Sequence, residues 1–497
     1  MGFISVIKKY NATFWASNVI ELFERWAWYG FYMAFALYLV NSKDTGALGL
    51  SQSQKGIIMG TGSMLLYLLP VITGAIGDKI GYKKILYLAF ALYISGFYMI
   101  KSFDTFGWMF FAFVWTCVGG AFFKPIISAM IARNTTDETS SIGFGIFYMM
   151  INIGGFIGPF IAGVLMQKTW DYVFYMSMIT IGINYAITFF FFKEPVVKDG
   201  KISLGKSILQ AFISIGITLR NWKYVMFLVI MILFWTAFNQ LYYSFPVFID
   251  QWVDTKVLYD GIYAVWPWLA KSIGTESGTI TAVSLTSMDS FFIIVFQLMV
   301  SAFVMRFRPL TAMMGGILVL AGGLGLMFST QSGWLVLFGI FVFGIGEMAS
   351  SPKFTEYVGR IAPAEQKALY MGTSFLPIAA GHQLAGLLSG DVYEKIADKI
   401  YLLQLEVAKR GISIPEISER FTKNDYVKMA SQKLGMEGSE LNNFLWTTYH
   451  PSNIWVLYAG VAVSAVVLLW LYDRFILASP ALPTNRDKLF KRGKFEE

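Results

Sequence analysis

The chain contains 497 residues, of which 56% are hydrophobic and only 14% are charged. A soluble domain carries about a quarter charged residues, so apolar side chains must cover much of the outside of this protein as well as its core. The net charge of +8 is spread over short segments between apolar runs, which argues against nucleic-acid binding and is typical of membrane-protein loops.

Residue types that support catalysis or metal binding are scarce. Cys117 is the only cysteine, which excludes a disulfide within the chain, and His382 and His450 are the only histidines. A zinc-type site needs several Cys or His ligands, and an enzyme needs a nucleophile with a base or a metal set. We therefore expect no metal, no cofactor and no enzymatic activity, and we interpret His382 as either structural or pocket-lining.

Twelve apolar segments are long enough to cross a bilayer, which takes about twenty residues. The first six are Phe14–Val40, Lys55–Ile76, Ile85–Ile100, Trp108–Ile131, Gly143–Met166 and Tyr172–Phe192. The second six are Tyr224–Phe248, Ile280–Met305, Leu310–Phe328, Trp334–Tyr357, Tyr370–Leu388 and Ile454–Ile476. We predict an all-α membrane protein with two six-helix bundles (1–192 and 224–477), a polar cytoplasmic linker (193–223) and a cytoplasmic tail (478–497).

Lysine and arginine predict the orientation of these helices. Basic residues follow the second, fourth, eighth and tenth segments and fill the linker. Twelve helices place all of them on one side, which is the cytoplasm by the positive-inside rule. We therefore predict a multi-pass protein of the cell (inner) membrane with both termini in the cytoplasm. The long loops Asp250–Thr279 and 390–453 then lie outside, the second as a solvated or interfacial cap.

A glycine-rich, charged segment begins at Gly74, after the second apolar segment, and reads Gly-Ala-Ile-Gly-Asp-Lys-Ile-Gly-Tyr-Lys-Lys. Its glycines allow a tight turn and close helix approach, and Asp78 can pair with a base on another helix. The segment resembles the loop signature G-x-x-x-D-R/K-x-G-x-R/K-R/K of the major facilitator superfamily. We expect Gly74, Asp78, Lys79 and Gly81 to form a gating or structural motif.

Three charged residues, Glu21, Glu24 and Arg25, lie inside the first apolar segment. Charges within a spanning helix are costly and usually functional. Glu21 and Arg25 are four residues apart, so they share a helix face and can pair. The segment that ends at Gly30 resembles the motif E-x-x-E-R-F-x-Y-Y-G of the proton-dependent oligopeptide transporter family, with tryptophan at two aromatic positions.

Other segments resemble motifs of the same family. They are Tyr67–Pro70, Phe123–Pro125, Phe147–Gly154, Phe234–Gln240 and Gly346–Pro352. The resemblance implies the major facilitator superfamily fold, with a substrate site near mid-membrane between the two bundles. It also implies a symporter that uses protons to import di- and tripeptides or peptide-like zwitterions by alternating access. We expect the protein to work as a monomer in the lipid bilayer.

The resemblance assigns roles to individual residues. Proton coupling would involve Glu21, Glu24, Arg25 and Lys124. Glu347 would meet the amino terminus of the substrate. The backbone and the terminal carboxylate of the substrate would be held by Tyr29, Tyr67 and Asn152.

The chain departs from the family pattern at four expected pocket positions. The family usually has Arg at Tyr32, Glu at Asn239, Asn-Pro at Asp289 and Ser290, and Trp at Ser374. The pocket thereby loses one cation and one carboxylate and gains Asp289. These departures motivate an alternative substrate, such as an amino-acid derivative, an organic anion or a drug-like molecule. A non-transporting membrane receptor is a further alternative.

Overall fold

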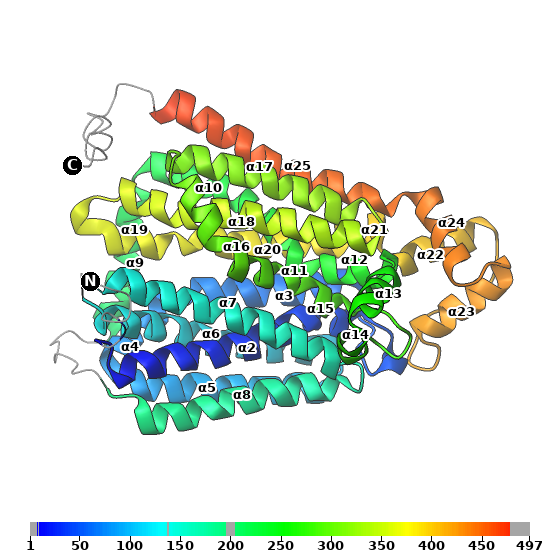
Figure 1. Cartoon of the computed structure of the whole chain (residues 1–497), viewed down its shortest axis with the longest axis horizontal. Helices are drawn as coiled ribbons and strands as arrows, with labels where there is room; N and C mark the ends of the chain where they lie inside the picture. The colour runs from blue at the N-terminus through cyan, green and yellow to red at the C-terminus, as the bar shows by residue number, and fades with distance from the viewer. Residues whose placement is uncertain (1–6, 8, 137–138, 195–203, 478–497) are drawn as a thin grey trace.

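The computed structural model describes residues 7, 9–136, 139–194 and 204–477. Within these ranges the regular secondary structure is helical, and strand-like pairing is confined to two isolated bridges. The helices run along the long axis of the molecule, and the first half of the chain lies beside the second (Figure 1). The predicted all-α membrane fold is confirmed.

Among the described residues, the first half contains seven long helices, because one span is divided in two. They are α2 (Ala12–Val40), α3 (Gln52–Leu68), α4 (Pro70–Ile80), α5 (Tyr82–Ser102), α6 (Phe106–Arg133), α7 (Ser140–Leu165) and α8 (Trp170–Phe191). The chain bends by 47° between α3 and α4. Pro70 explains this bend, since proline lacks the N–H that would continue the helix and its ring clashes with the preceding turn.

Breaks are more frequent in the second half. Its helices along the long axis are α10 (Trp222–Phe238), α11 (Gln240–Tyr243), α12 (Phe245–Trp252), α15 (Ala282–Thr286), α16 (Met288–Val304), α17 (Pro309–Phe328), α18 (Gly333–Ile361), α19 (Lys367–Thr373), α20 (Phe375–Leu387) and α25 (Ile454–Leu471). Single residues, among them Asn239, Ser287 and Ser374, separate consecutive pieces. The predicted spans Tyr224–Phe248, Ile280–Met305 and Tyr370–Leu388 are therefore interrupted.

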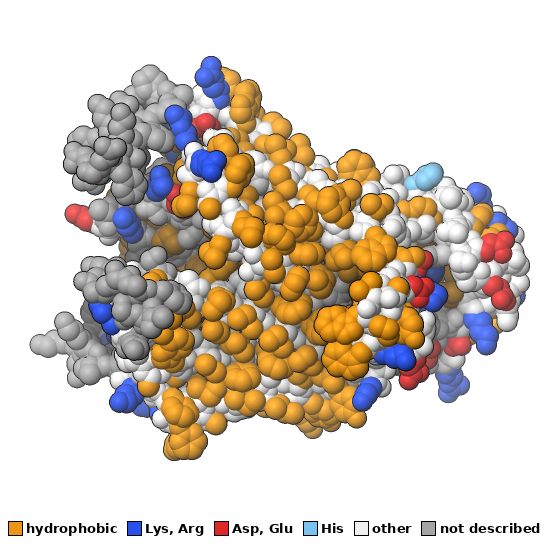
Figure 2. Space-filling view, viewed as in Figure 1, with side chains coloured by type: hydrophobic (Ala, Val, Ile, Leu, Met, Phe, Trp, Pro, Cys, Tyr) orange, Lys and Arg blue, Asp and Glu red, His pale blue; other side chains and the backbone are white. Residues whose placement is uncertain are grey.

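Length and apolar composition identify nine described helices that can cross a membrane, or ten when α3 and α4 count as one span. The other two predicted spans are special cases. α2 contains Glu21, Glu24 and Arg25, and α20 is only 13 residues long. Hydrophobic side chains cover the middle of the molecule, whereas charged side chains gather at its two ends (Figure 2). A surface of this kind is suited to a bilayer.

Two regions predicted as connections contain helices of their own. The linker includes α9 (Leu204–Leu219), and the loop 390–453 folds as α21 (Tyr393–Ala397), α22 (Lys399–Lys409), α23 (Lys423–Leu434) and α24 (Ser439–Tyr449). We call 393–449 the cap and the end that carries it the cap end; the opposite, base end holds the start of α2 and the end of α25 (Figure 1). Residues 195–203 of the linker and the tail 478–497 lie outside the described residues.

Glycines let the two halves meet at backbone distance near the cap end. A Cβ atom on Gly56 of α3 would lie 2.2 Å from the carbonyl oxygen of Gly386 on α20, and one on Gly386 would lie 2.4 Å from the Gly56 carbonyl oxygen. Such distances are shorter than any real carbon contact, so only glycine fits at this crossing. Small residues permit close helix packing of this kind within membranes.

Candidate functional site

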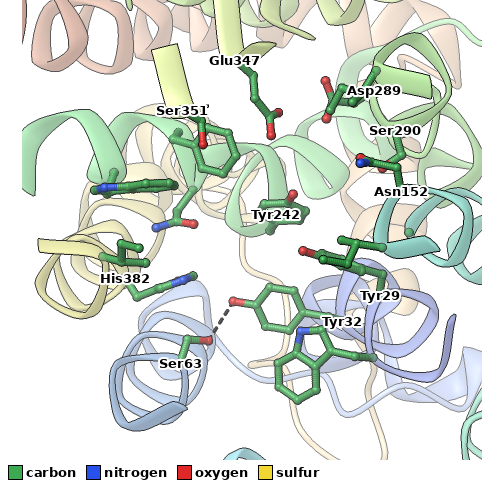
Figure 3. A pocket seen from close by; sticks show the side chains of 18 of the residues that line it. Tyr29, Tyr32, Ser63, Asn152, Tyr242, Asp289, Ser290, Glu347, Ser351 and His382 are labelled. Atoms are coloured by element: carbon green, nitrogen blue, oxygen red, sulfur yellow. Dashed lines mark hydrogen bonds between the residues drawn. The ribbon is translucent and has the colours of Figure 1, made fainter. Parts of the chain in front are cut away.

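A cavity of about 200 Å³ lies between the two halves of the molecule. α2, α3 and α7 line it from the first half, and α10, α11, α16, α18 and α20 line it from the second (Figure 3). It brings together seven of the eight residues predicted to bind substrate: Tyr29, Tyr32, Tyr67, Asn152, Asn239, Asp289 and Glu347. These residues span more than 300 positions of the chain, so only the packing of the two halves creates the site.

Two acidic residues, Asp289 of α16 and Glu347 of α18, enter the cavity from the second half (Figure 3). Their carboxyl groups are close enough to interact electrostatically. Among the described residues, Asp289 Oδ1 and Glu347 Oε2 are buried without a hydrogen-bond partner. A buried polar atom without a partner costs about 1–3 kcal/mol, and more when it is charged. The pair is therefore suited to hold a proton or a cationic group of a ligand.

Helix breaks explain how two of the polar residues reach the cavity. Asn239 occupies the break between α10 and α11, and its buried Nδ2 has no hydrogen-bond partner in the described part of the chain. Asp289 lies in the first turn of α16, just after the break at Ser287. A helix N-terminus favours a carboxylate. Interrupted helices commonly form the ion and substrate sites of transporters.

Hydrogen bonds and ring contacts order the wall opposite the acids. Tyr32 Oη and Ser63 Oγ lie 2.8 Å apart and join α2 to α3 (Figure 3). Asn152 Nδ2 donates a 2.8 Å hydrogen bond to the carbonyl oxygen of Tyr148, one turn earlier on α7. The Tyr29 ring lies 6.2 Å from that of Tyr242, so aromatic rings from both halves meet at the cavity.

His382 of α20 lines the cavity and connects several groups. Its Nδ1 lies 3.1 Å from Tyr243 Oη, and its ring stacks on Tyr67 with centroids 4.9 Å apart. Lys124 Nζ lies 3.8 Å from the centroid of the same Tyr67 ring, which is close enough for a cation–π interaction. The sequence left two interpretations of His382, structural or pocket-lining, and the structure places it in the pocket wall.

Several lining residues were not predicted. They are Trp28, Ser63, Leu66, Tyr148, Ile151, Gly155, Trp235, Phe238, Tyr242, Ser290, Ile293, Ser351 and Ile378. Tyr148, Trp235 and Ser351 lie inside the segments that resemble family motifs, so the resemblance could have identified them as pocket residues. Tyr242 carries no such signal, because its exposure to the cavity depends on the break at Asn239.

The charged residues of α2 form a buried cluster beside the cavity. Arg25 Nε lies 3.1 Å from Glu21 Oε1 and 2.5 Å from Glu24 Oε2. Tyr93 of α5 donates a 2.5 Å hydrogen bond to Glu24 Oε1. The predicted pairing of Glu21 with Arg25 is confirmed. Lys124 of α6 has no ion-pair partner within 4.0 Å among the described residues, which leaves a cation beside the Tyr67 ring.

Ser374 does not line this cavity. It lies between α19 and α20, and its Oγ donates a 2.7 Å hydrogen bond to the carbonyl oxygen of Met371. A serine at a helix break satisfies the local backbone in this way. The prediction that Ser374 contributes to the pocket wall therefore has no geometric support here.

The predicted loop motif lies at the base end, where α4 meets α5. Asp78 Oδ1 accepts a 2.5 Å hydrogen bond from Tyr82 Oη and lies 3.6 Å from Arg133 Nη2 of α6. Gly81 has a φ of 103°, which side chains rarely adopt. Lys79 is in the last turn of α4. Asp78 thus links this turn to the end of α6. Its partner Arg133 is the base on another helix with which Asp78 was expected to pair.

Gly74 packs within the same half. A Cβ atom on Gly74 would lie 3.5 Å from Pro125 Cβ, which is an ordinary contact. Gly77 is tighter, because its Cβ would lie 2.3 Å from Ile126 Cδ1. The glycines of the motif therefore bring α4 close to α6.

The cap closes one end of the molecule by binding the first half. Lys423 Nζ of α23 donates hydrogen bonds to the carbonyl oxygens of Val40 (2.8 Å) and Leu50 (2.9 Å). The next residue, Asn424, donates from its backbone to Ser42 Oγ (3.1 Å) and from Nδ2 to Asp44 Oδ2 (2.8 Å). Val40 ends α2, so Lys423 satisfies a carbonyl that has no partner within its own helix.

A buried lysine joins the halves beneath the cap. Lys55 of α3 is fully buried, and its Nζ donates hydrogen bonds to Gln52 Oε1 (2.8 Å) and to the carbonyl oxygen of Tyr243 (2.9 Å). Gln52 Nε2 in turn donates a 2.7 Å hydrogen bond to Asp398 Oδ2 of the cap. Polar contacts as well as the glycine crossing therefore join the two halves at the cap end.

Two helical halves around a central polar cavity, with an apolar belt outside, define a polytopic membrane transporter fold. The family model described as Major Facilitator Superfamily matches residues 19–253. The chain is 24% identical over 482 residues to the peptide transporter YePEPT of Yersinia enterocolitica, a match that covers 79% of this chain and 90% of that protein.

Two further comparisons agree. The chain is 27% identical over 229 residues to a dipeptide and tripeptide permease A of Erwinia pyrifoliae, covering 43% of this chain and 45% of the relative. A crystal structure of a POT family transporter in complex with 5-aminolevulinic acid superposes with a TM-score of 0.67 at 16% identity, over 94% of this chain and 99% of the other. The chain is thus similar to the Major Facilitator Superfamily model over its first half, to peptide transporters along its sequence and to a POT family transporter in its fold.

Proposed function

We propose that this protein is a proton-coupled symporter that imports di- and tripeptides or similar zwitterions by alternating access. The observation that carries the proposal is the pair of unpartnered carboxylate oxygens on Asp289 and Glu347, inside a cavity enclosed by both halves. Such a pair is suited to an ammonium group, because hydrogen bonds between charged partners are stronger than neutral ones. The peptide transport by the relatives supports the same substrate class.

We propose that the amino terminus of the substrate meets Glu347 and Asp289, while Tyr29, Tyr67 and Asn152 hold its backbone and carboxylate. Tyr32 and Asn239 complete the wall. The acids lie on the second half, whereas Arg25 and Lys124 lie on the first. This polarity matches the two charged ends of a short peptide.

Proton coupling is assigned to Glu21, Glu24, Arg25 and Lys124. Arg25 contacts both glutamates, so protonation of either one weakens an ion pair and leaves the guanidinium free for another partner. Lys124 lies on Tyr67, a residue of the cavity wall. Proton and substrate binding are thereby linked through shared partners rather than direct contact.

We propose that residues 1–192 and 224–477 rock as two bundles around the cavity, with 193–223 as linker and the motif at Gly74, Asp78, Lys79 and Gly81 as part of the inner gate. The positive-inside rule supports the cell (inner) membrane with both termini cytoplasmic, which makes the cap external. One chain supplies both walls of the cavity, which supports a functional monomer.

The decisive experiment is uptake into proteoliposomes that contain the purified protein. An inwardly directed pH gradient should drive accumulation of a radiolabelled dipeptide, and a protonophore should abolish it. Accumulation that does not depend on the pH gradient would exclude proton coupling. Binding without any flux in either direction would support the receptor alternative instead.

The departures of the pocket from the family pattern support a second class of substrate, which is not a peptide. Two carboxylates and Asn239 at one wall favour ligands rich in amino or amide groups, including amino-acid derivatives. Competition between the labelled dipeptide and a panel of amino-acid derivatives, organic anions and drug-like molecules separates the two. If derivatives compete and peptides of two or three residues do not, the substrate is not a peptide.

A further inference from the structure

An aromatic hairpin projects from the second half near the cap end. It consists of α13 (Lys256–Val265) and α14 (Pro267–Ile273), and it follows α12 along the chain (Figure 1). Large apolar side chains at its tip are exposed: Tyr263 (41%), Val265 (88%), Trp266 (56%) and Trp268 (67%). Water disfavours so much apolar surface in one place, so this tip needs an occupant.

The hairpin is fixed at the depth where two spanning helices end. The backbone N–H of Asp254 donates a 2.8 Å hydrogen bond to the carbonyl oxygen of Gln331, in the turn between α17 and α18. The N–H of Gly333, the first residue of α18, donates back to the Asp254 carbonyl oxygen at 3.2 Å. The base of the hairpin thus lies at the boundary of the apolar belt.

Tight packing makes the hairpin a rigid attachment. A Cβ atom on Gly261 would lie 2.6 Å from Trp334 Cζ2 of α18, and one on Gly274 would lie 2.3 Å from Tyr259 Cε2. The first contact holds α13 against α18, and the second closes α14 onto α13. Trp334 is itself 49% exposed, so the hairpin surface continues into the membrane-facing side chains of α18. Figure 2 shows hydrophobic side chains over this region.

Charge contributes little to the exposed surface. Residues 256–273 contain two lysines and one aspartate, which leaves a net charge of +1. Lys256 Nζ and Asp260 Oδ1 form a 3.3 Å ion pair, and Lys271 Nζ lies 5.7 Å from the centroid of the Tyr263 ring. The hairpin is therefore built for apolar and aromatic contact, in contrast to the charged cap.

We propose that the α13–α14 hairpin is an interfacial anchor that inserts Val265, Trp266 and Trp268 into the boundary between headgroups and acyl chains of the outer leaflet. Tryptophan and tyrosine favour this layer, because one part of each ring system is apolar and the other is polar. The phospholipid bilayer is the occupant, since the hairpin surface is continuous with the belt that faces it. The anchor holds α12 and α18 at one depth while the halves move.

Spin labelling of a cysteine at Val265 tests the proposal in proteoliposomes of phosphatidylcholine. The background is Cys117→Ser, which removes the only native thiol. Leu298→Cys, 85% exposed on α16, serves as the lipid reference, and Ser413→Cys in the cap serves as the water reference. The label at 265 should collide with oxygen as the one at 298 does, and with a water-soluble nickel chelate at least tenfold less than the one at 413.

Nickel collisions equal to those at Ser413 would overturn the proposal, because the tip would then lie in water. Low collisions with both reagents would also overturn it, because protein would then cover the tip. Replacing phosphatidylcholine by a mixture with phosphatidylglycerol should leave the result unchanged, as expected for apolar insertion. The double change Trp266→Ser and Trp268→Ser should raise nickel collisions at 265, whereas Trp266→Phe with Trp268→Phe should restore protection.

Discussion

The ammonium group of Lys423 donates a 2.8 Å hydrogen bond to the carbonyl oxygen of Val40, a contact between residues 383 positions apart in the chain. It places the cap of the second half on the last turn of α2 in the first half. The cap end can open only when this bond and its neighbour to Leu50 are broken. We therefore expect the cap to act as part of the gate rather than as a separate appendage.

Lys423→Ala should favour the state open at the cap end by about 1–3 kcal/mol, because two hydrogen bonds from a charged donor are lost. Labelling of Ser63→Cys, in the cavity wall, by a membrane-impermeant maleimide should rise about tenfold in a Cys117→Ser background. Lys428→Ala on the same helix is the matched control and should change nothing. Equal labelling of the two variants would show that the cap does not contribute to the gate.

Cysteines at Asp44 and Asn424 test the same gate by holding it closed. These side chains are joined by a 2.8 Å hydrogen bond, so a short bifunctional methanethiosulfonate should link the two cysteines across the halves in a Cys117→Ser background. Uptake should stop on cross-linking and return with a reducing agent. Full uptake by the cross-linked protein would mean that the cap and α2 need not separate.

Gly56→Ala should block closure of the cap end, because its Cβ would lie 2.2 Å from the Gly386 carbonyl oxygen. We expect uptake to fall at least tenfold while the protein stays folded, as judged by its elution from size-exclusion chromatography. Gly322→Ala in α17 is the control, since a Cβ there meets nothing within 4 Å. If Gly56→Ala transports normally, the halves do not meet this closely during the cycle.

Glu347→Gln and Asp289→Asn should each weaken binding of a dipeptide at least tenfold, because a charged partner of the substrate ammonium is lost. The amide variants preserve shape, so thermal stability should be unchanged or higher. Binding measured by calorimetry should be affected less for a dipeptide whose amino group is acetylated. Glu276→Gln, on an exposed loop, is the control. Unchanged dipeptide affinity in both variants would remove the acids from the site.

Lys124→Ala and Glu24→Gln should abolish uptake driven by a pH gradient. Exchange of substrate between equal pools should survive, because it requires no net proton movement. Both assays are made on the same reconstituted protein, with Lys168→Ala as an exposed-lysine control. Full gradient-driven uptake by either variant would make that residue structural and direct the search for the proton route to Asp289 and Glu347.

Cysteine labelling tests the orientation of the chain. Ser413→Cys in the cap and Glu365→Cys between α18 and α19 are exposed at opposite ends of the molecule. In intact cells an impermeant maleimide should label the first and spare the second, as the positive-inside rule predicts. The opposite pattern would invert the protein in the membrane.

The sequence by itself determined the class of the fold and much of the site. Apolar runs of about twenty residues can satisfy their backbone in lipid only as helices, so composition alone located most of the spanning segments, although not the breaks within them. Glu21, Glu24 and Arg25 were identifiable because charge inside an apolar helix is costly. The spacing of Glu21 and Arg25 also determined their pairing, since that contact lies within one helix.

Only the tertiary structure decided what depends on contacts between distant segments. Asp289 and Glu347 lie 58 residues apart and meet because α16 and α18 pack side by side. The breaks at Asn239 and Ser374 are local, but one faces the cavity and the other does not, and packing decides which. No periodic pattern in the sequence predicts the hydrogen bond from Lys423 to Val40, because this contact forms only where the cap and α2 meet at one end of the molecule.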